Sequence, residues 1–366
     1  MKLTLLREHL LKGLNIVEHG ISSSSHLPIL ASIRIDANNG NEVTLVSTNL
    51  ELAIVHTLIG KVSEPGTVVI PFGVMRDILK NLTAEKIHLH LEGSSVSVNA
   101  DNYEALITAE NPDDFPIIPP ISKKNNPISI LSGLLKNIFN KTIVSTQYSE
   151  IRPELNGIYF NLGDDGLVCA GTDSFRLVEY KSDAGGPETE CVIPLKTVDT
   201  FVRIFSDEDE VELFFDENQV LAESKHTALI SRLVDGKFPN YKDIIPKDSV
   251  TVVHSKRGEL ENALKVVRVF SGKANDVSLF LENNGKILRV ESRENSVGEN
   301  KYRVPVKTVG NSSDMKVSFN WKYLLDGIGI YGSDEISLGI NGTDKPVVIR
   351  GKGEENLVYV VMPIRE

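Results

Sequence analysis

Two histidines spaced two residues apart, His88 and His90, come closest in this sequence to a metal-binding pattern. Alternate residues of a β-strand share one face, so both imidazoles would project from the same side of a strand. A protein zinc site takes three or four ligands, and no third ligand stands at a useful spacing. We therefore expect exposed strand histidines. The two cysteines, Cys169 and Cys191, provide neither a disulfide framework nor a zinc ligand set.

The acidic residues form no catalytic arrangement. Asp113 and Asp114 stand in a proline-rich stretch without a partner acid or base, and the acidic run 207–210 is typical of a solvated turn before a strand. The sequence contains no phosphate-binding loop and no G-x-S-x-G nucleophile elbow. A glycosylation sequon at Asn81–Thr83 has no role in a cytoplasmic protein. The sequence thus predicts a protein that is not an enzyme and holds no metal and no cofactor.

Composition and charge are those of a soluble globular protein. The 366 residues allow two to four domains, and 41% of them are hydrophobic. No apolar run approaches the ~20 residues of a membrane span, and the amphipathic N-terminal segment lacks the apolar core and cleavage site of a signal peptide. With only two cysteines, we expect a reducing cytoplasm, and we expect no membrane partner. The net charge of −11, taken alone, argues against nucleic-acid binding.

Three copies of one sequence phrase organise the chain. Each copy has a short β-rich run, a proline or asparagine, and an amphipathic helix. An acidic turn and alternating strands follow, as in Ile87, Leu89 and Leu91. At a spacing of about 125 residues, the copies are Thr67–Leu82, Glu190–Phe205 and Lys316–Tyr331.

A second helix with its own strand pair precedes each phrase, so the repeated unit is helix, strands, helix, strands. Turn residues at 38–40, 163–166 and 283–285 predict a hairpin in each copy. Proline-containing stretches at 111–127 and 235–249 are typical of linkers. The sequence therefore predicts an α+β fold of three repeated domains. The six expected helices span 7–18, 72–82, 130–142, 195–205, 256–270 and 320–330.

Positive charge is concentrated in those helices. The six windows hold 13 Lys and Arg against seven acids, a net charge of +6, whereas the rest of the chain holds 26 bases and 43 acids, a net charge of −17. One explanation is propensity, because Lys and Arg are good helix formers. The other is a basic surface lined by helices that contacts phosphates without reading bases, with an acidic exterior that discourages stray DNA.

Short motifs distributed over the chain carry a family resemblance. They are Leu27–Leu30, Val46–Ile54, Arg152–Phe160, Gly171–Val178, Ser231–Pro246, Phe319–Asp326 and Tyr359–Glu366. In this order, and as a set, they resemble the bacterial DNA polymerase sliding clamps, the β subunit of the replicative polymerase. No single motif is decisive, but together they are specific and cover essentially the whole chain.

The resemblance implies three clamp-type domains, 1–120, 127–245 and 246–366, with helices on one face and antiparallel sheets on the other. It also implies a head-to-tail homodimer that closes into a ring with its helices inside. Twelve helices ~10 Å across give a perimeter of about 120 Å and leave a free diameter of roughly 28 Å. Grooves about 8 Å deep imply a duplex about 20 Å across, which fits this ring but not the roughly 9 Å left by six helices.

By the same resemblance, the chain is a processivity factor that encircles double-stranded DNA without reading its sequence. Its implied partners are the replicative DNA polymerase alpha-type subunit, the clamp loader, and repair or translesion polymerases, which bind through short linear peptides. The residues implied to contact DNA are Arg152, Lys196, Tyr148 and Ser149.

The implied ring interface joins an edge strand of the first domain to one of the third. Adding a strand across subunits would satisfy both exposed edges. Phe270 is the expected apolar anchor, with an ordinary core phenylalanine as the alternative. The interface residues are Tyr103, Ala105 and Ile107 on one side, and Val269, Phe270 and the strand near Tyr302 on the other.

The implied peptide pocket lies between the second and third domains. Aliphatic walls, an adaptable Met362 and an amphipathic tyrosine suit a peptide, and Arg365 can hold backbone or carboxylate groups. The family commonly has Gly-His where this chain has Ser174-Phe175, which makes one wall more apolar. The alternative for Leu155, Leu177 and Ile244 is ordinary core. The pocket set is Leu155, Thr172, Phe175, Arg176, Leu177, Pro239, Ile244, Asn320, Tyr323, Val360, Met362, Pro363 and Arg365.

Two other function classes remain open at this point. One is a monomeric peptide-binding scaffold that never encircles DNA. The other is an enzyme built from repeated α+β modules, which a catalytic constellation in one repeat would favour, and the sequence shows none.

Overall fold

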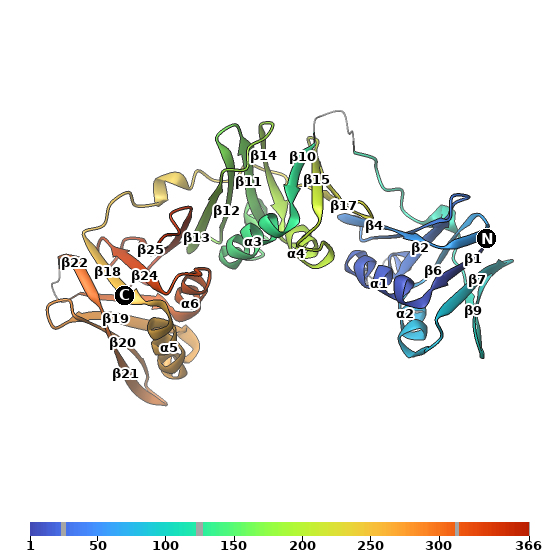
Figure 1. Cartoon of the computed structure of the whole chain (residues 1–366). Coiled ribbons are helices and arrows are strands. Elements are labelled where there is room, and N and C mark those ends of the chain that lie inside the picture. The colour runs from blue at the N-terminus through green and yellow to red at the C-terminus, as the bar shows by residue number, and fades with distance from the viewer. Residues whose placement is uncertain (23–26, 122–126, 312–314, 366) are drawn as a thin grey trace. The chain divides into compact units, whose positions relative to one another are not determined.

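The computed structural model describes residues 1–22, 27–121, 127–311 and 315–365. These residues form two compact units. Unit 1 comprises Met1–Lys136 and Lys196–Leu233, and unit 2 comprises Asn137–Leu195 and Val234–Glu366. Figure 1 shows the whole chain with its helices and strands labelled. The central repeat contributes to both units, and the domain boundaries given above stay a prediction. Residues 23–26 and part of the predicted 111–127 linker lie outside the described residues.

The six α-helices of the described residues confirm the predicted windows to within a few residues. They are α1 Arg7–Val17, α2 Phe72–Asn81, α3 Ser132–Thr142, α4 Leu195–Ile204, α5 Arg257–Val267 and α6 Trp321–Gly329. The helices α1 and α5 bury residues at the same spacing, i, i+3, i+4 and i+7, as expected for one apolar face. In unit 1, α1 contacts α2 and both pack on strands, as Figure 1 shows. In unit 2, α5 contacts α6.

Unit 1 contains two antiparallel sheets, one of five strands in the order β5-β1-β7-β8-β9 and one of eight in the order β10-β15-β16-β17-β4-β3-β2-β6. The strands are β1 Lys2–Leu6, β2 Ser32–Ala37, β3 Glu42–Thr48, β4 Leu52–Ile59, β5 Lys61–Glu64, β6 Gly66–Pro71, β7 Lys86–Glu92, β8 Ser95–Ala100, β9 Tyr103–Thr108, β10 Ile128–Leu131, β15 Glu210–Phe215, β16 Gln219–Glu223 and β17 Thr227–Arg232. The predicted alternation is confirmed, since Ile87 and Leu89 on β7 are buried.

Unit 2 likewise contains two antiparallel sheets, one of nine strands in the order β14-β11-β12-β13-β26-β25-β24-β18-β22 and one of four in the order β21-β20-β19-β23. The strands are β11 Gly157–Gly163, β12 Gly166–Thr172, β13 Arg176–Ser182, β14 Thr189–Pro194, β18 Thr251–Lys256, β19 Asp276–Glu282, β20 Ile287–Glu294, β21 Gly298–Pro305, β22 Lys307–Gly310, β23 Lys316–Asn320, β24 Glu335–Ile340, β25 Val347–Gly351 and β26 Leu357–Val361. The predicted hairpins at 38–40, 163–166 and 283–285 are confirmed.

Each large sheet joins strands of two sequence repeats. In unit 1, β4 of the first repeat pairs with β17 of the second. In unit 2, β13 of the second repeat pairs with β26 of the third. Both pairings are antiparallel and main-chain hydrogen bonds cross each of them, so two repeats share one continuous sheet at each junction.

The helices and cysteines add two further observations. Within the described residues, no helix combines the length and apolar character needed to cross a bilayer. Both cysteines are free thiols, on strands β12 and β14, which flank β11. Burial raises the pKa of Cys169 strongly and the pKa of Cys191 to about 12, so neither thiol is reactive.

Candidate functional site

A tight turn between β12 and β13 positions the rim of the candidate peptide site. The Thr172 hydroxyl donates to the carbonyl oxygen of Arg176 at 2.7 Å and accepts from the amide of Ser174 at 3.2 Å. The Asp173 carboxylate accepts from the amides of Phe175 and Arg176 at 2.9 and 3.0 Å. Ser174 has φ +77°, the left-handed conformation that short polar residues tolerate. The turn therefore holds Phe175 outward, with 60% of its surface exposed.

The pairing of β13 with β26 forms the floor of this site. Leu177 stands opposite Val360, and both are buried. The ladder continues beyond β26, because the amide of Met362 donates to the carbonyl oxygen of Phe175 at 2.8 Å. Met362 is half-buried and Pro363 is buried. A flexible thioether therefore lies next to an exposed aromatic ring on the same rim.

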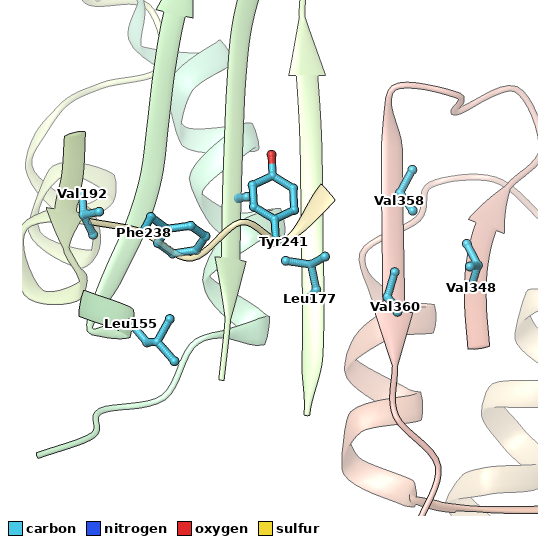
Figure 2. Packing of buried hydrophobic residues seen from close by; sticks show 9 residues of the cluster. Leu155, Leu177, Val192, Phe238, Tyr241, Val348, Val358 and Val360 are labelled. Atoms are coloured by element: carbon cyan, nitrogen blue, oxygen red, sulfur yellow. The ribbon is translucent and has the colours of Figure 1, made fainter. Parts of the chain in front are cut away.

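Below the rim, a hydrophobic cluster connects strands of the second and third repeats. Phe238 and Tyr241 lie over the strands between Leu155 and Leu177, as Figure 2 shows. Pro239 and Ile244, nearby in the sequence, were predicted as pocket residues, but both are exposed. Phe238 and Tyr241 were not predicted, although their spacing of three in a proline-containing segment was visible. The buried members are Leu155, Ala170, Leu177, Val192, Phe238, Tyr241, Val348, Val358 and Val360.

Arg176 is a buried cation that fixes the site. Its side chain is 10% exposed, its Nε donates to Asp173 at 3.0 Å, and its Nη1 donates to Asp326. Its guanidinium carbon lies 4.4 Å from the centroid of the Tyr323 ring. Burial alone would lower the pKa of Arg176, but Tyr359 and the Asp326 and Asp173 carboxylates outweigh it and raise this pKa. Through these two ion pairs, Arg176 helps to position the rim.

The start of α6 supplies the second wall. Tyr323 stacks on Phe175 with ring centroids 6.5 Å apart and an interplanar angle of 24°. Asn320 caps the helix by accepting from the amide of Lys322 at 2.9 Å. The Tyr359 hydroxyl donates to the carbonyl oxygen of Tyr323 at 2.7 Å. A Cβ on Gly327 would lie 2.4 Å from the Tyr359 ring, so only glycine allows α6 this close.

The final residues leave this site. The amide of Ile364 donates to the carbonyl oxygen of Ser318 at 2.7 Å. Arg365 is exposed and borders a different hollow, together with Lys316 and Asn341. The structure thus brings together most of the predicted pocket residues around the turn, β26 and α6, whereas Pro239, Ile244 and Arg365 lie at its margins. We call the gathered set, Leu155, Thr172, Phe175, Arg176, Leu177, Asn320, Tyr323, Val360, Met362 and Pro363, the β13–β26 site.

The predicted DNA contacts are on exposed segments. Arg152 is exposed, and its Nη1 donates to the Ser174 hydroxyl at 3.1 Å. Its amide donates to the Ser149 hydroxyl at 3.1 Å, and Tyr148 in the same loop is 72% exposed. Lys196 is exposed on α4, in unit 1. Arg152, Lys196 and Tyr148 are thus available to a ligand, whereas Ser149 is half-buried, and Arg152 also contacts the turn of the β13–β26 site.

The predicted interface residues lie on or beside two edge strands. Among the described residues, β9 and β21 each have a neighbour on one side only. On β9, Tyr103 and Ala105 are half-buried and Ile107 is buried, whereas Leu106, which the sequence analysis passed over, is 66% exposed. Alternation along β9 was the signal that pointed to Leu106.

The opposite side of the predicted interface lies at the end of α5. Val269 is 69% exposed and Phe270 is half-buried. Phe270 lies against Gly298 at the start of β21, where a Cβ would be 3.5 Å from its ring. Tyr302 is on β21 itself.

The two histidines of β7 have local partners. A hydrogen bond of 2.8 Å joins His88 Nδ1 to the Thr4 hydroxyl, and His90 Nδ1 lies 2.9 Å from Glu92. In the part of the chain that the structure describes, no three His, Cys, Asp or Glu side chains gather as metal ligands would.

Comparisons with known proteins agree over the full length. Three models of the DNA polymerase III beta subunit match in succession: the N-terminal domain over residues 1–119, the central domain over 129–240 and the C-terminal domain over 242–365. The beta sliding clamp of Staphylococcus epidermidis is 28% identical over 377 residues, which cover 100% of this chain and 99% of that protein.

Solved structures give the same result. The DNA polymerase sliding clamp of Bacillus subtilis has a TM-score of 0.95 at 25% identity and covers 100% of this chain and 99% of its own. A Pseudomonas aeruginosa sliding clamp bound to griselimycin has a TM-score of 0.94 at 25% identity, with 100% of both chains covered. The chain therefore belongs to the DNA polymerase III beta subunit family, the sliding clamps, and consists of three clamp domains with antiparallel sheets.

Proposed function

We propose that two copies of this chain close head to tail into a ring that encircles duplex DNA and tethers the replicative polymerase to it. The observation that carries this proposal is the full set of three clamp domains in one chain, matched in order from residue 1 to residue 365. The family is that of a processivity subunit and not a catalytic one, which removes the repeated-module enzyme from consideration. The predicted cytoplasmic location accords with replication relatives and stays part of the proposal.

Ring closure would use the two open sheet edges. An unpaired edge strand presents free main-chain donors and acceptors, which favour pairing with another chain. We propose that β9 of one copy pairs with β21 of the other. The exposed Leu106 and Val269, with Phe270 beside β21, would supply apolar contact. The interface set of the sequence analysis, with Leu106 added, is therefore the proposed one.

The DNA contacts would be weak and independent of sequence. Part of the positive charge of the helices is neutralised locally, for example by ion pairs of Lys136 with Asp207 and of Lys141 with Glu354. Among the described residues, no ion pair joins Lys12, Lys80 or Lys196, and all three are exposed. A few such cations suit a ring that slides, because many tight phosphate contacts would hold it in place. Arg152, Tyr148 and Ser149 are the further proposed contacts.

Topology gives the decisive test. A preloaded ring should stay on nicked circular DNA and be lost rapidly once the circle is linearised, because sliding off an end breaks no bond. The measurement is the fraction of protein that co-elutes with DNA before and after restriction cleavage. Equal loss from both forms, or a monomeric mass at micromolar concentration, would instead favour the monomeric peptide-binding scaffold.

We propose that the β13–β26 site binds short linear peptides of the polymerase alpha-type subunit, the clamp loader and repair or translesion polymerases. An exposed aromatic ring, a half-buried methionine and a buried aliphatic floor are the features that anchor apolar peptide side chains. Met362→Ala should weaken peptide binding by about tenfold or more. The same variant should keep the dimer mass, and a monomeric variant would show that the site is misplaced.

A further inference from the structure

The two smaller sheets of the chain match the two halves of its nine-stranded sheet. In unit 2, the nine-stranded sheet has four strands on one side of the β13–β26 junction, β14-β11-β12-β13, and five on the other, β26-β25-β24-β18-β22. The smaller sheets have four strands, in the order β23-β19-β20-β21, and five strands, in the order β9-β8-β7-β1-β5. Their open edges are β21 and β9, which take the places of β13 and β26.

The two junctions within the chain have the same register. Each is bounded at both ends by a main-chain hydrogen bond, and the two end bonds are equally spaced along the chain in both junctions. At one end, the amides of Thr57 and Lys181 donate to the carbonyl oxygens of His226 and Asn356, both at 2.8 Å. At the other end, the amides of Arg232 and Met362 donate to the carbonyl oxygens of Glu51 and Phe175, at 3.0 and 2.8 Å. One junction can therefore serve as a template for another.

Rows of directly paired residues show which residue of β9 corresponds to which residue of β17 and β26. Each row starts four residues before the first residue of α1, α3 or α5 and then crosses three further strands. The rows are Leu3, Leu89, Val98 and Ala105; Ile128, Leu213, Ala222 and Leu229; and Val253, Leu338, Ile349 and Tyr359. Ala105 of β9 therefore corresponds to Leu229 of β17 and to Tyr359 of β26.

Rows through the other half of each repeat identify the residues of β21 in the same way. Each starts four residues before the first residue of α2, α4 or α6. The rows are Val68, Ile35, Leu45 and His56; Cys191, Phe160, Cys169 and Tyr180; and Val317, Leu279, Val290 and Tyr302. Tyr302 of β21 therefore corresponds to His56 of β4 and to Tyr180 of β13.

These correspondences fix a register for the junction between two copies. His56 stands opposite Thr227, two residues before Leu229, and Tyr180 stands opposite Leu357, two residues before Tyr359. By the same rule, Tyr302 of one copy stands opposite Tyr103 of the other, which is two residues before Ala105.

From this template we propose that β9 of one copy and β21 of the other pair antiparallel with Tyr103 opposite Tyr302, so that Glu104 faces Lys301 directly across the junction. The inference rests on the proposed ring and specifies which residues meet in it. The occupant of each open edge is thus a second copy of this chain.

The charges of the two edges support this register. Glu104 is exposed, and among the described residues no ion pair joins it. Lys301 is also exposed and contacts Glu299 of its own strand at 3.3 Å. Opposite charges that face each other across an antiparallel pair stabilise it, and like charges destabilise it. A shift by two residues toward Glu299 would place two carboxylates opposite each other, so the charges disfavour that alternative.

The apolar side of the same edges also fits. The register places Ile107 opposite Gly298, since each lies further along its strand from the Glu104–Lys301 pair by three residues. The Phe270 ring lies beside Gly298, where a Cβ would be 3.5 Å from it. With no side chain at Gly298, Ile107 of the second copy can pack on the Phe270 ring.

Cysteine cross-linking of the full-length chain tests the register. Glu104→Cys is combined in one chain with Lys301→Cys, or with Glu299→Cys or Arg303→Cys as matched controls. Directly opposite Cα atoms lie about 4.5–5.5 Å apart, within disulfide range, whereas diagonal neighbours are roughly 7–8 Å apart. After mild oxidation, the Lys301→Cys combination should give about fivefold more disulfide-linked dimer than either control on non-reducing gels. The unmodified chain should give none, because burial keeps Cys169 and Cys191 unreactive.

Charge exchange tests the Glu104–Lys301 pair itself. Glu104→Lys and Lys301→Glu should each raise the dimer dissociation constant by about tenfold, because like charges would then face each other at both junctions of the ring. Both changes in one chain restore opposite charges, so the constant should return to within about threefold of the unmodified chain. Glu42→Lys, the same change at an exposed residue of β3, should have no effect. Sedimentation equilibrium measures all four.

The outcomes separate this inference from the proposed ring. More cross-linking with Glu299→Cys or Arg303→Cys, or no rescue by the double charge exchange, would overturn the register while a dimeric mass still supported the ring. A monomeric mass of the unmodified chain would overturn the ring and the register together.

Discussion

The β12–β13 turn of unit 2 and the β3–β4 turn of unit 1 share their hydrogen bonds but differ in the side chains that they carry. In both, a threonine hydroxyl and an Asx side chain satisfy the main-chain groups of the turn. Unit 2 then places Arg176 in an ion-pair network with Asp173 and Asp326, whereas unit 1 has the buried Leu52 at the same position.

This difference shows that one set of residues determines the backbone of the turn and another set provides the side chains that a ligand would contact. Main-chain hydrogen bonds to Thr and Asx depend on a few polar atoms, so repeats that have diverged widely keep them. The rim side chains contribute nothing to those bonds and vary freely. Phe175 and Met362 make one rim apolar, and Glu51 and Arg232 make the other charged.

Arg176 and Leu52 occupy the same position in the two turns. Replacing each by methionine should give the largest difference in unfolding free energy between the two turns. Arg176→Met leaves the nearly buried Asp173 carboxylate without its cation and should cost about 3 kcal/mol of unfolding free energy. Leu52→Met conserves volume and should cost about 1 kcal/mol or less. Guanidinium denaturation followed by the fluorescence of Trp321, the chain's single tryptophan and part of unit 2, measures the first effect. Hydrogen exchange of the β4 amides measures the effect of Leu52→Met. Equal losses of unfolding free energy in the two variants would contradict the difference between the two turns.

Low pH should lower the stability of the β4–β17 pairing in unit 1 but not that of the β13–β26 pairing in unit 2. Burial, with help from His226 and Lys12, lowers the pKa of His56 on β4 to about 4. The unfolded chain, with a histidine pKa near 6.5, binds the proton more readily, so stability is lost as the pH falls from about 6.5 toward 4. The loss should be about 2 kcal/mol at pH 5.

The matching position in unit 2 makes this pH effect specific. Eight residues after the turn threonine, unit 2 has Tyr180 in place of His56, and a phenol takes up no proton in this pH range. Hydrogen exchange, corrected for intrinsic rates, should therefore show lost protection in β4 but not in β13. His56→Gln should remove the effect. Unchanged protection of β4 at pH 5 would contradict the low pKa.

The smallest expected effect is the loss of the threonine hydroxyl, which should destabilise both turns by a similar amount. Thr48→Val and Thr172→Val each remove a hydroxyl that donates once and accepts once, and each should cost about 1 kcal/mol. The amide exchange of Leu50 and Ser174 reports the two losses separately. If only one of the two variants lost stability, the two turns would differ in energy although they agree in geometry.

Most residues of the β13–β26 site were predicted from the sequence, and the differences have two separate causes. Thr172, Phe175, Leu177, Tyr323 and Met362 were placed through motifs and come together in unit 2. Phe238 and Tyr241 were missed because a proline-rich linker gives no periodic signal of burial. Arg365 was placed in the pocket by the family resemblance, but the chain turns away at Ile364, whose amide donates to the carbonyl oxygen of Ser318.

The sequence by itself determined the six helices, the alternating strands, the three repeats and the family, because these depend on local periodicity, turn chemistry and motif order. Tertiary structure alone decided that β13 pairs with β26. It also decided that Arg176 pairs with Asp326, 150 residues away. Such contacts join segments far apart in the chain, and no local pattern specifies which distant strand or carboxylate will be the partner.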